Sequence, residues 1–182
     1  MKLEAPIFSI GEKTKLMTLN SFETSMTIVD TLKHEVGMMF DMINQAVSRM
    51  DGEFWKEDEN DWTYSYLLFH ILEAIEFYNS NSAKEWKPIN DVSVNSREKE
   101  TEALKSKDKL FFEDYTARVK KQTMNILSNH DDKGILGNDG FGERGFNSIM
   151  HKYMYVMNHS MFHLGELTKS LRARNMKRIV WK

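Results

Sequence analysis

Two histidines lie four residues apart in the segment NHSMFHLGEL near the end of the chain, at His159 and His163. An α-helix turns about 100° per residue, so residues i and i+4 lie on one face, one turn apart. Two imidazoles placed in this way can chelate one metal ion. The same spacing also arises by chance, and two polar residues on a partly exposed helix face are an equal alternative. A metal site therefore needs a third ligand from elsewhere in the chain.

His70 is the candidate for that third ligand. It lies in YSYLLFHILEAIEFY, and its helix face also carries apolar and aromatic residues, namely Tyr66, Leu67, Ala74 and Phe77. A single histidine on such a face is more often hydrogen-bonded in the core than bound to a metal. Burying three imidazoles without strong partners is costly, however, and one divalent ion would satisfy all three. Three histidines with an open position are typical of catalytic zinc, and imidazole also suits nickel, iron and copper.

Two glutamates follow these histidines at a spacing of three residues. Glu73 comes after His70, and Glu166 comes after His163. Each could be a fourth ligand, an acceptor for an imidazole N–H, or a general base. The alternative is an ordinary surface glutamate, which we slightly favour for Glu73. A carboxylate-bridged pair of metals would require Glu-x-x-His motifs, whereas the order here is His-x-x-Glu, so we expect a single metal.

The remaining histidines fit this site less well. His34 lies roughly 120° from the apolar stripe of its segment, which predicts an exposed position or an interface. His130 follows a helical segment, where a cation suits the helix dipole. His151 precedes His159 by two turns and is rotated about 80° from it, too far for the same metal.

Helical periodicity marks the elements that must position these residues. It covers four segments, at about 21–50, 62–79, 96–129 and 147–175. Asn20 with Glu23 resembles a capping box for the first segment, and Asp61 is the expected N-cap of the second. A short β-structured connector is expected around 89–94. Five of the nine glycines fall in 134–145, which predicts a loop.

Four amphipathic segments bury their apolar stripes most simply as an all-α four-helix bundle. The length of 182 residues fits a single domain over 1–182 with a substantial core. The links at about 80–95 and 134–145 are long enough to cross over the bundle. The second link contains Arg144, which could attract an anionic substrate, although we favour a solvated loop arginine.

Composition narrows the function classes. The chain contains no cysteine, which excludes disulfides, Cys-based zinc sites and a cysteine nucleophile. The formal net charge of −2 provides no basic field for nucleic acid or anionic membranes, and the basic segment 169–182 is read as a helix end and solvated tail. No signal peptide or membrane-spanning run is evident. We therefore expect a cytoplasmic protein that binds neither membranes nor nucleic acid.

The histidine pattern resembles that of the DinB/YfiT-like superfamily. The family signature H-x-x-x-H-x-G-Q is matched by His159, His163 and Gly165, whereas Glu166 replaces the glutamine. A histidine in the middle of the second helix, His70, also fits the pattern. The similarity extends over about 20–175. The substitution at Glu166 would add negative charge to the site and lower the Lewis acidity of a metal there.

The resemblance implies an up-down-down-up bundle with zinc or nickel held by His70, His159 and His163. It also implies a homodimer, and activity as a metal-dependent hydrolase or thiol S-transferase that uses a low-molecular-weight thiol such as bacillithiol or mycothiol. Because the chain has no cysteine, the thiol would come from a cosubstrate. The alternative is a non-catalytic bundle stapled by metal, acting as a binding or stress-response module. Closure of the site by Glu166 as a fourth ligand would favour that alternative.

Overall fold

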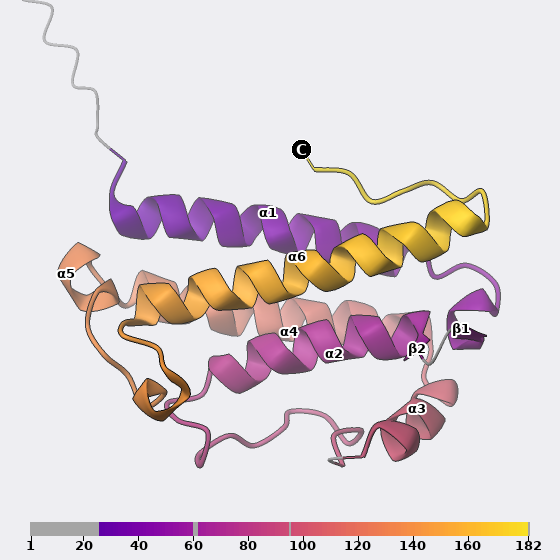
Figure 1. Ribbon diagram of the computed structural model, residues 1–182, viewed down its shortest axis with the longest axis horizontal. Helices are drawn as coiled ribbons and strands as arrows, with labels where there is room; N and C mark the ends of the chain where they lie inside the picture. Colours follow the sequence, from indigo (N-terminus) through magenta and orange to yellow (C-terminus); the bar gives the residue numbers. More distant parts are fainter. Residues whose placement is uncertain (1–25, 60–61, 95, 182) are drawn as a thin grey trace, which may run out of the picture.

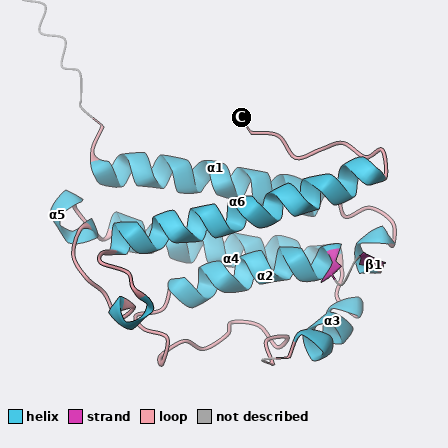
Figure 2. Cartoon of the chain, viewed as in Figure 1, coloured by secondary structure: helices cyan, strands magenta, loops and turns pink. Residues whose placement is uncertain are grey.

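The computed structural model describes residues 26–59, 62–94 and 96–181, and over these residues the chain is mostly helical (Figures 1 and 2). The longer helices are α1 (Ile28–Ser48), α2 (Tyr64–Tyr78), α3 (Arg97–Lys105), α4 (Lys109–Ser128) and α6 (Ile149–Ala173). Shorter helical elements are η1 (Phe54–Lys56), α5 (Asp132–Ile135) and η2 (Gly142–Arg144). Two short strands, β1 (Asp58–Glu59) and β2 (Trp62–Thr63), pair in antiparallel fashion. The predicted all-α class is confirmed.

Four long helices lie side by side, with α1 and α2 each packed against both α4 and α6 (Figure 1). Hydrogen bonds fix their directions. The Tyr64 hydroxyl at the start of α2 donates to the Ala46 carbonyl near the end of α1, at 2.9 Å. Asn79, just after α2, donates to Thr123 near the end of α4, also at 2.9 Å. The Tyr153 hydroxyl near the start of α6 donates to Asn79 Oδ1 at 3.0 Å, so α6 runs opposite to α2. Helices α1 and α6 therefore run one way, and α2 and α4 run the other way (Figure 1).

The core lies between these four helices. The predicted stripe of α1 is buried at Val36, Phe40, Ile43 and Val47. Helix α2 is buried on more than one face, because α3 also packs against it. Burying an aliphatic or aromatic side chain contributes roughly 1.5–3 kcal/mol, so these stripes provide the main drive for helix association. No helix in the described part of the chain has the length and apolar character needed to cross a bilayer.

The starts of α1 and α2 come later than predicted. Helix α1 begins at Ile28, and α2 begins after Thr63, whose side chain accepts a hydrogen bond from the Tyr66 N–H. A threonine hydroxyl satisfies one of the amide donors left without a partner at a helix start. The caps predicted at Asn20, Glu23 and Asp61 lie outside the described residues.

The prediction of one helix over 96–129 was wrong, because the chain breaks between α3 and α4. Asp108 caps α4 by accepting a hydrogen bond from the Phe111 N–H at 2.9 Å. The Ser106 hydroxyl donates to the Ala103 carbonyl at the end of α3. Serine and aspartate side chains compete with helical hydrogen bonds in this way. The break lets α3 pack against α2, near the middle of which His70 lies.

The connector predicted to be β-structured at 89–94 is instead a loop. The Asn90 side-chain oxygen accepts hydrogen bonds from the backbone N–H groups of Val92 and Ser93, at 2.8 and 3.1 Å. Such a turn satisfies backbone donors locally and leaves none of them for a strand partner. The glycine-rich segment 134–145 is also more ordered than a plain loop, since it contains the end of α5 and all of η2.

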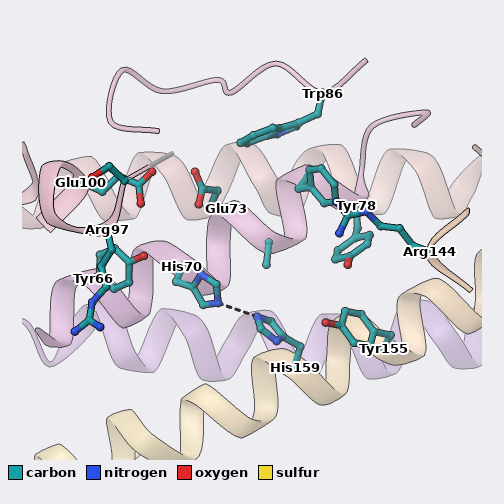
Figure 3. Close-up of a pocket in the computed structure, with 13 residues that line it drawn as sticks. Tyr66, His70, Glu73, Tyr78, Trp86, Arg97, Glu100, Arg144, Tyr155 and His159 are labelled. Atoms are coloured by element: carbon teal, nitrogen blue, oxygen red, sulfur yellow. Dashed lines mark hydrogen bonds between the residues drawn. The ribbon is translucent and has the colours of Figure 1, made fainter. Parts of the chain in front are cut away.

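A buried glutamate anchors the connector to the helices. Glu76 of α2 is 1% exposed, and its carboxylate accepts hydrogen bonds from the Ile89 N–H at 2.6 Å and from the Tyr115 hydroxyl. Burial raises the pKa of Glu76. Because Tyr115 belongs to α4, this carboxylate ties two helices and the connector together. It thereby holds the connector across α2, on the side of the helix that also carries the candidate site (Figures 1 and 3).

Candidate metal centre

Helices α2 and α6 bring the three predicted histidines together. His70 Nε2 lies 3.2 Å from His159 Nε2, and the ring centroids of His159 and His163 are 4.6 Å apart. One ligand atom from each of the three imidazoles lies within 4.8 Å of the others. All three side chains are half-buried, and Figure 3 shows the rings of His70 and His159 facing each other. The cluster could therefore hold a metal ion.

Glu166 contacts this cluster through His163. Its Oε2 lies 2.6 Å from His163 Nδ1. A carboxylate accepts hydrogen bonds, so this contact places the proton on Nδ1 and leaves Nε2 to bind a metal. Within the described residues, the group of close ligand atoms comprises the three histidines without either glutamate. This geometry favours Glu166 as the residue that orients His163.

Glu73 is not the surface residue that we slightly favoured. It is half-buried and lines a cavity next to His70. Burial raises the pKa of its carboxyl group, and a hydrogen bond with the Ser93 side chain lowers it in part. The sequence could not show this environment, because the connector and α3 that enclose Glu73 are distant along the chain.

Aromatic rings flank the imidazoles. Tyr66 stacks on His70 with ring centroids 6.3 Å apart, and Tyr155 stacks on His159 with centroids 5.9 Å apart. Trp62 lies 6.1 Å from His70 on another side, again between ring centroids. These rings restrict the orientations of the imidazoles that they contact.

The surroundings of His70 and His159 favour the neutral form of these two imidazoles. Burial, followed by the proximity of His159 and His163, lowers the pKa of His70 to about 4. Burial and the proximity of His163 also lower the pKa of His159. Metals bind the neutral form of imidazole, so the site is ready to bind a cation at neutral pH without first releasing protons from these two residues. The donor set of three imidazoles suits zinc or nickel.

We expect the metal-free protein to lose stability as the pH falls from about 6.5 to about 4. The folded-state pKa of His70 is depressed from 6.5 to about 4, so the unfolded chain binds more protons between these values. The free energy of unfolding therefore decreases as the pH is lowered through that window. Urea unfolding in the presence of a chelator at several pH values measures the slope. His70→Gln should reduce it, whereas the exposed His34→Gln should leave it unchanged; equal slopes in all three proteins would contradict this assignment.

A cavity of about 440 Å³ opens beside His70 and His159 (Figure 3). Its volume is in the range of small-molecule sites. Aromatic side chains form much of its wall, namely Tyr66, Phe77, Tyr78, Trp86 and Tyr155. Its charged residues are Glu73, Glu100, Arg97 and Arg144. Arg144 was expected to be a solvated loop arginine; it is exposed, but it also lines this cavity.

Several cavity residues were missed by sequence reasoning, notably Glu100 and Trp86. Neither belongs to a motif, and both reach the cavity only because α3 and the connector fold against α2. The other histidines, His34, His130 and His151, lie outside the cluster, as predicted. The His151 ring accepts a hydrogen bond from the Asn147 N–H at 3.3 Å instead.

Comparison with models of known protein families, with curated proteins and with solved structures found no match to this chain. The family resemblance therefore rests on the histidine motif and on the order of the helices.

Proposed function

We propose that this protein is a DinB/YfiT-like four-helix bundle of up-down-down-up topology, with one divalent metal held by His70, His159 and His163. Zinc or nickel is the proposed metal. The observation that carries the proposal is the approach of the three imidazoles to within 4.8 Å at the edge of a cavity. The opposite directions of the α1–α6 and α2–α4 pairs support the topology (Figure 1).

The proposed activity is that of a metal-dependent hydrolase or a thiol S-transferase acting on a small molecule. A bound metal would supply Lewis acidity, which lowers the pKa of a coordinated water or thiol. The chain supplies the remaining requirements. Glu166 orients His163 through Nδ1, the aromatic rings restrict the orientations of the imidazoles, and the cavity offers space for a substrate beside two of the ligands. With no cysteine in the chain, a thiol would enter as a cosubstrate.

The second candidate function is a metal staple without catalysis. The ligands come from two helices, so a metal bound to His70 and to His159 would crosslink α2 to α6, and this favours the staple. Structural zinc sites are usually closed by four protein ligands. Here the group of close ligand atoms in the described residues comes from three histidine side chains, and it borders a cavity. These features favour the catalytic proposal.

Elemental mass spectrometry on protein purified without an affinity tag tests the metal site. We expect about one zinc or nickel ion per chain in the wild type and a loss of at least tenfold in His70→Ala, because three-ligand binding becomes two-ligand binding. His151→Ala is the matched control and should retain the metal. No metal in the wild type after incubation with both ions, or full retention in His70→Ala, would contradict the proposal.

A thiol-dependent assay then separates the two candidate functions. Metal-loaded protein is incubated with a panel of small thiols and an electrophile such as a chloro-dinitroarene, and thiol consumption is followed. Turnover that disappears in His70→Ala supports the transferase, and hydrolysis of activated esters tests the hydrolase in the same way. Stoichiometric metal with neither activity would favour the staple.

A further inference from the structure

Three of the four charged residues of the cavity, two carboxylates and one guanidinium, lie at opposite ends of it according to their charge. The fourth, Arg97, lies at the acidic end with its guanidinium over the Trp62 ring. Glu73 of α2 and Glu100 of α3 lie at one end, whereas Arg144 of η2 lies at the other end (Figure 3). His70 and His159 lie between these two ends. The three charged residues come from different elements, so their arrangement reflects the packing of α3 and of the glycine-rich segment around α2.

Neither carboxylate at the acidic end forms an ion pair with a cation among the described residues. Glu100 is 5% exposed, and one of its oxygens accepts a hydrogen bond from the Val94 N–H at 3.0 Å. None of the ion pairs within 4.0 Å in the described part of the chain involves Glu73 or Glu100. Arg97 lies in the same helix as Glu100, but its guanidinium lies over the Trp62 ring, 4.2 Å from the centroid. Two carboxylates thus share a partly enclosed space.

Burying carboxylates without a cation is costly, and each raises the cost of ionising the other. The pKa of Glu73 is raised accordingly, first by burial and then by Glu100 and Glu76. An ammonium group of a ligand would relieve this cost, since it can donate three hydrogen bonds. The acidic end is therefore suited to a primary amine.

The opposite end offers a guanidinium at the mouth of the cavity. The Arg144 side chain lies over the Phe77 ring, 4.8 Å from the centroid, and next to Tyr78. The ion pairs within 4.0 Å among the described residues do not include Arg144. A guanidinium presents N–H donors in a planar fork that matches a carboxylate. The Phe77 ring and a hydrogen bond with Tyr78 together restrict the orientation of the Arg144 guanidinium at this end of the cavity.

We propose that the cavity binds a zwitterionic small molecule, with its ammonium group against Glu73 and Glu100 and its carboxylate against Arg144. The apolar part of the ligand lies along the aromatic wall, beside His70 and His159. An anion alone would leave the acidic end without a partner, and an amine alone would leave Arg144 unused. This inference names the substrate class for the proposed function, but the recognition of charge involves none of the three histidines.

A series of ω-amino carboxylates from glycine to 8-aminooctanoate tests the proposal, because it varies the distance between the two charges. Binding to the full chain is measured by calorimetry in the presence of a chelator. Each compound is compared with the alkylamine and the alkyl carboxylate of the same length. We expect one chain length to bind at least tenfold more tightly than both single-charge analogues. If no length shows this preference, the proposal is wrong.

Variants of the charged residues locate the binding. Arg144→Gln should reduce the affinity of the preferred zwitterion to that of the matching amine, and Glu73→Gln should weaken it at least several-fold. Arg172→Gln, an exposed change on α6, should have no effect. A preference that survives in Arg144→Gln would overturn the assignment.

Zinc content, measured on the same proteins after incubation with zinc and without the chelator, reports on the proposed function separately. Arg144→Gln should bind zinc as the wild type does, since Arg144 is not a metal ligand. Zwitterion binding without zinc binding would contradict the metal site alone. Zinc binding without zwitterion preference would contradict the substrate class alone.

Discussion

Adding zinc to the metal-free protein is expected to raise its free energy of unfolding by about 4 kcal/mol when free zinc is about 1,000-fold above its Kd. The gain arises because the three imidazoles converge only in the folded chain, where helices α2 and α6 bring them within 4.8 Å of each other. In the unfolded chain His70 and His159 are separated by 89 positions. Urea unfolding at a series of zinc concentrations measures the effect.

The double variant His159→Ala, His163→Ala should lose this stabilisation, since one histidine remains of the three. Glu166→Gln should show an intermediate response. Changes at residues that orient metal ligands typically weaken metal affinity about 10–100-fold, which lowers the gain by roughly 1.4–2.8 kcal/mol. Glu113→Gln, an exposed change on α4, is the matched control. An equal response to zinc in the double variant and the wild type would rule out this site.

The motif that the chain resembles has glutamine at the position of Glu166. Both side chains can accept a hydrogen bond from an imidazole N–H, but only the carboxylate brings a negative charge. Its 2.6 Å contact with His163 Nδ1 makes that imidazole a stronger donor to a metal. We therefore expect glutamate at position 166, compared with glutamine, to strengthen metal binding and to reduce the Lewis acidity of the metal.

Replacing Asp139 by asparagine is expected to destabilise the protein by about 3–5 kcal/mol, the usual cost of breaking a buried ion pair. Asp139 pairs with Lys152, whose side chain is 4% exposed and whose ammonium also lies 4.8 Å from the centre of the Phe141 ring. Burial lowers the pKa of Lys152, and Asp139 opposes that shift. Without Asp139, the lysine would be left charged and buried without its partner. Chemical denaturation at neutral pH measures the loss.

A double-mutant cycle with Lys152→Met separates the ion pair from other effects. The combined variant should be more stable than Asp139→Asn alone, because no buried charge remains. Asp41→Asn is the control, since its ion pair with Lys120 is largely exposed and should contribute less than about 1 kcal/mol. A similar loss at Asp41 and Asp139 would show that burial does not determine the cost.

The features that depend on neighbours along one helix could be predicted from the amino-acid sequence. Periodic apolar residues predicted the long helices, and α6 lies within the predicted 147–175. The i, i+4 spacing placed His159 and His163 on one face. Such features follow from helix geometry and from the burial of a stripe, so they require no knowledge of the partner helix. His70 was expected on a stripe facing the core, but it is half-buried and lines the cavity, whereas Phe69, Leu72 and Ile75 are among the fully buried residues of α2.

The surroundings of the histidines depend on tertiary contacts that no local sequence pattern predicts. Asp108 caps α4 locally, but the position of α3 after the break depends on its packing against α2. The meeting of Glu73, Glu100 and Arg144 in one cavity depends on how α3, the connector and the glycine-rich segment pack around α2. These contacts join residues far apart in the chain, and their formation is governed by long-range packing and buried anchors such as Glu76 rather than by any local pattern.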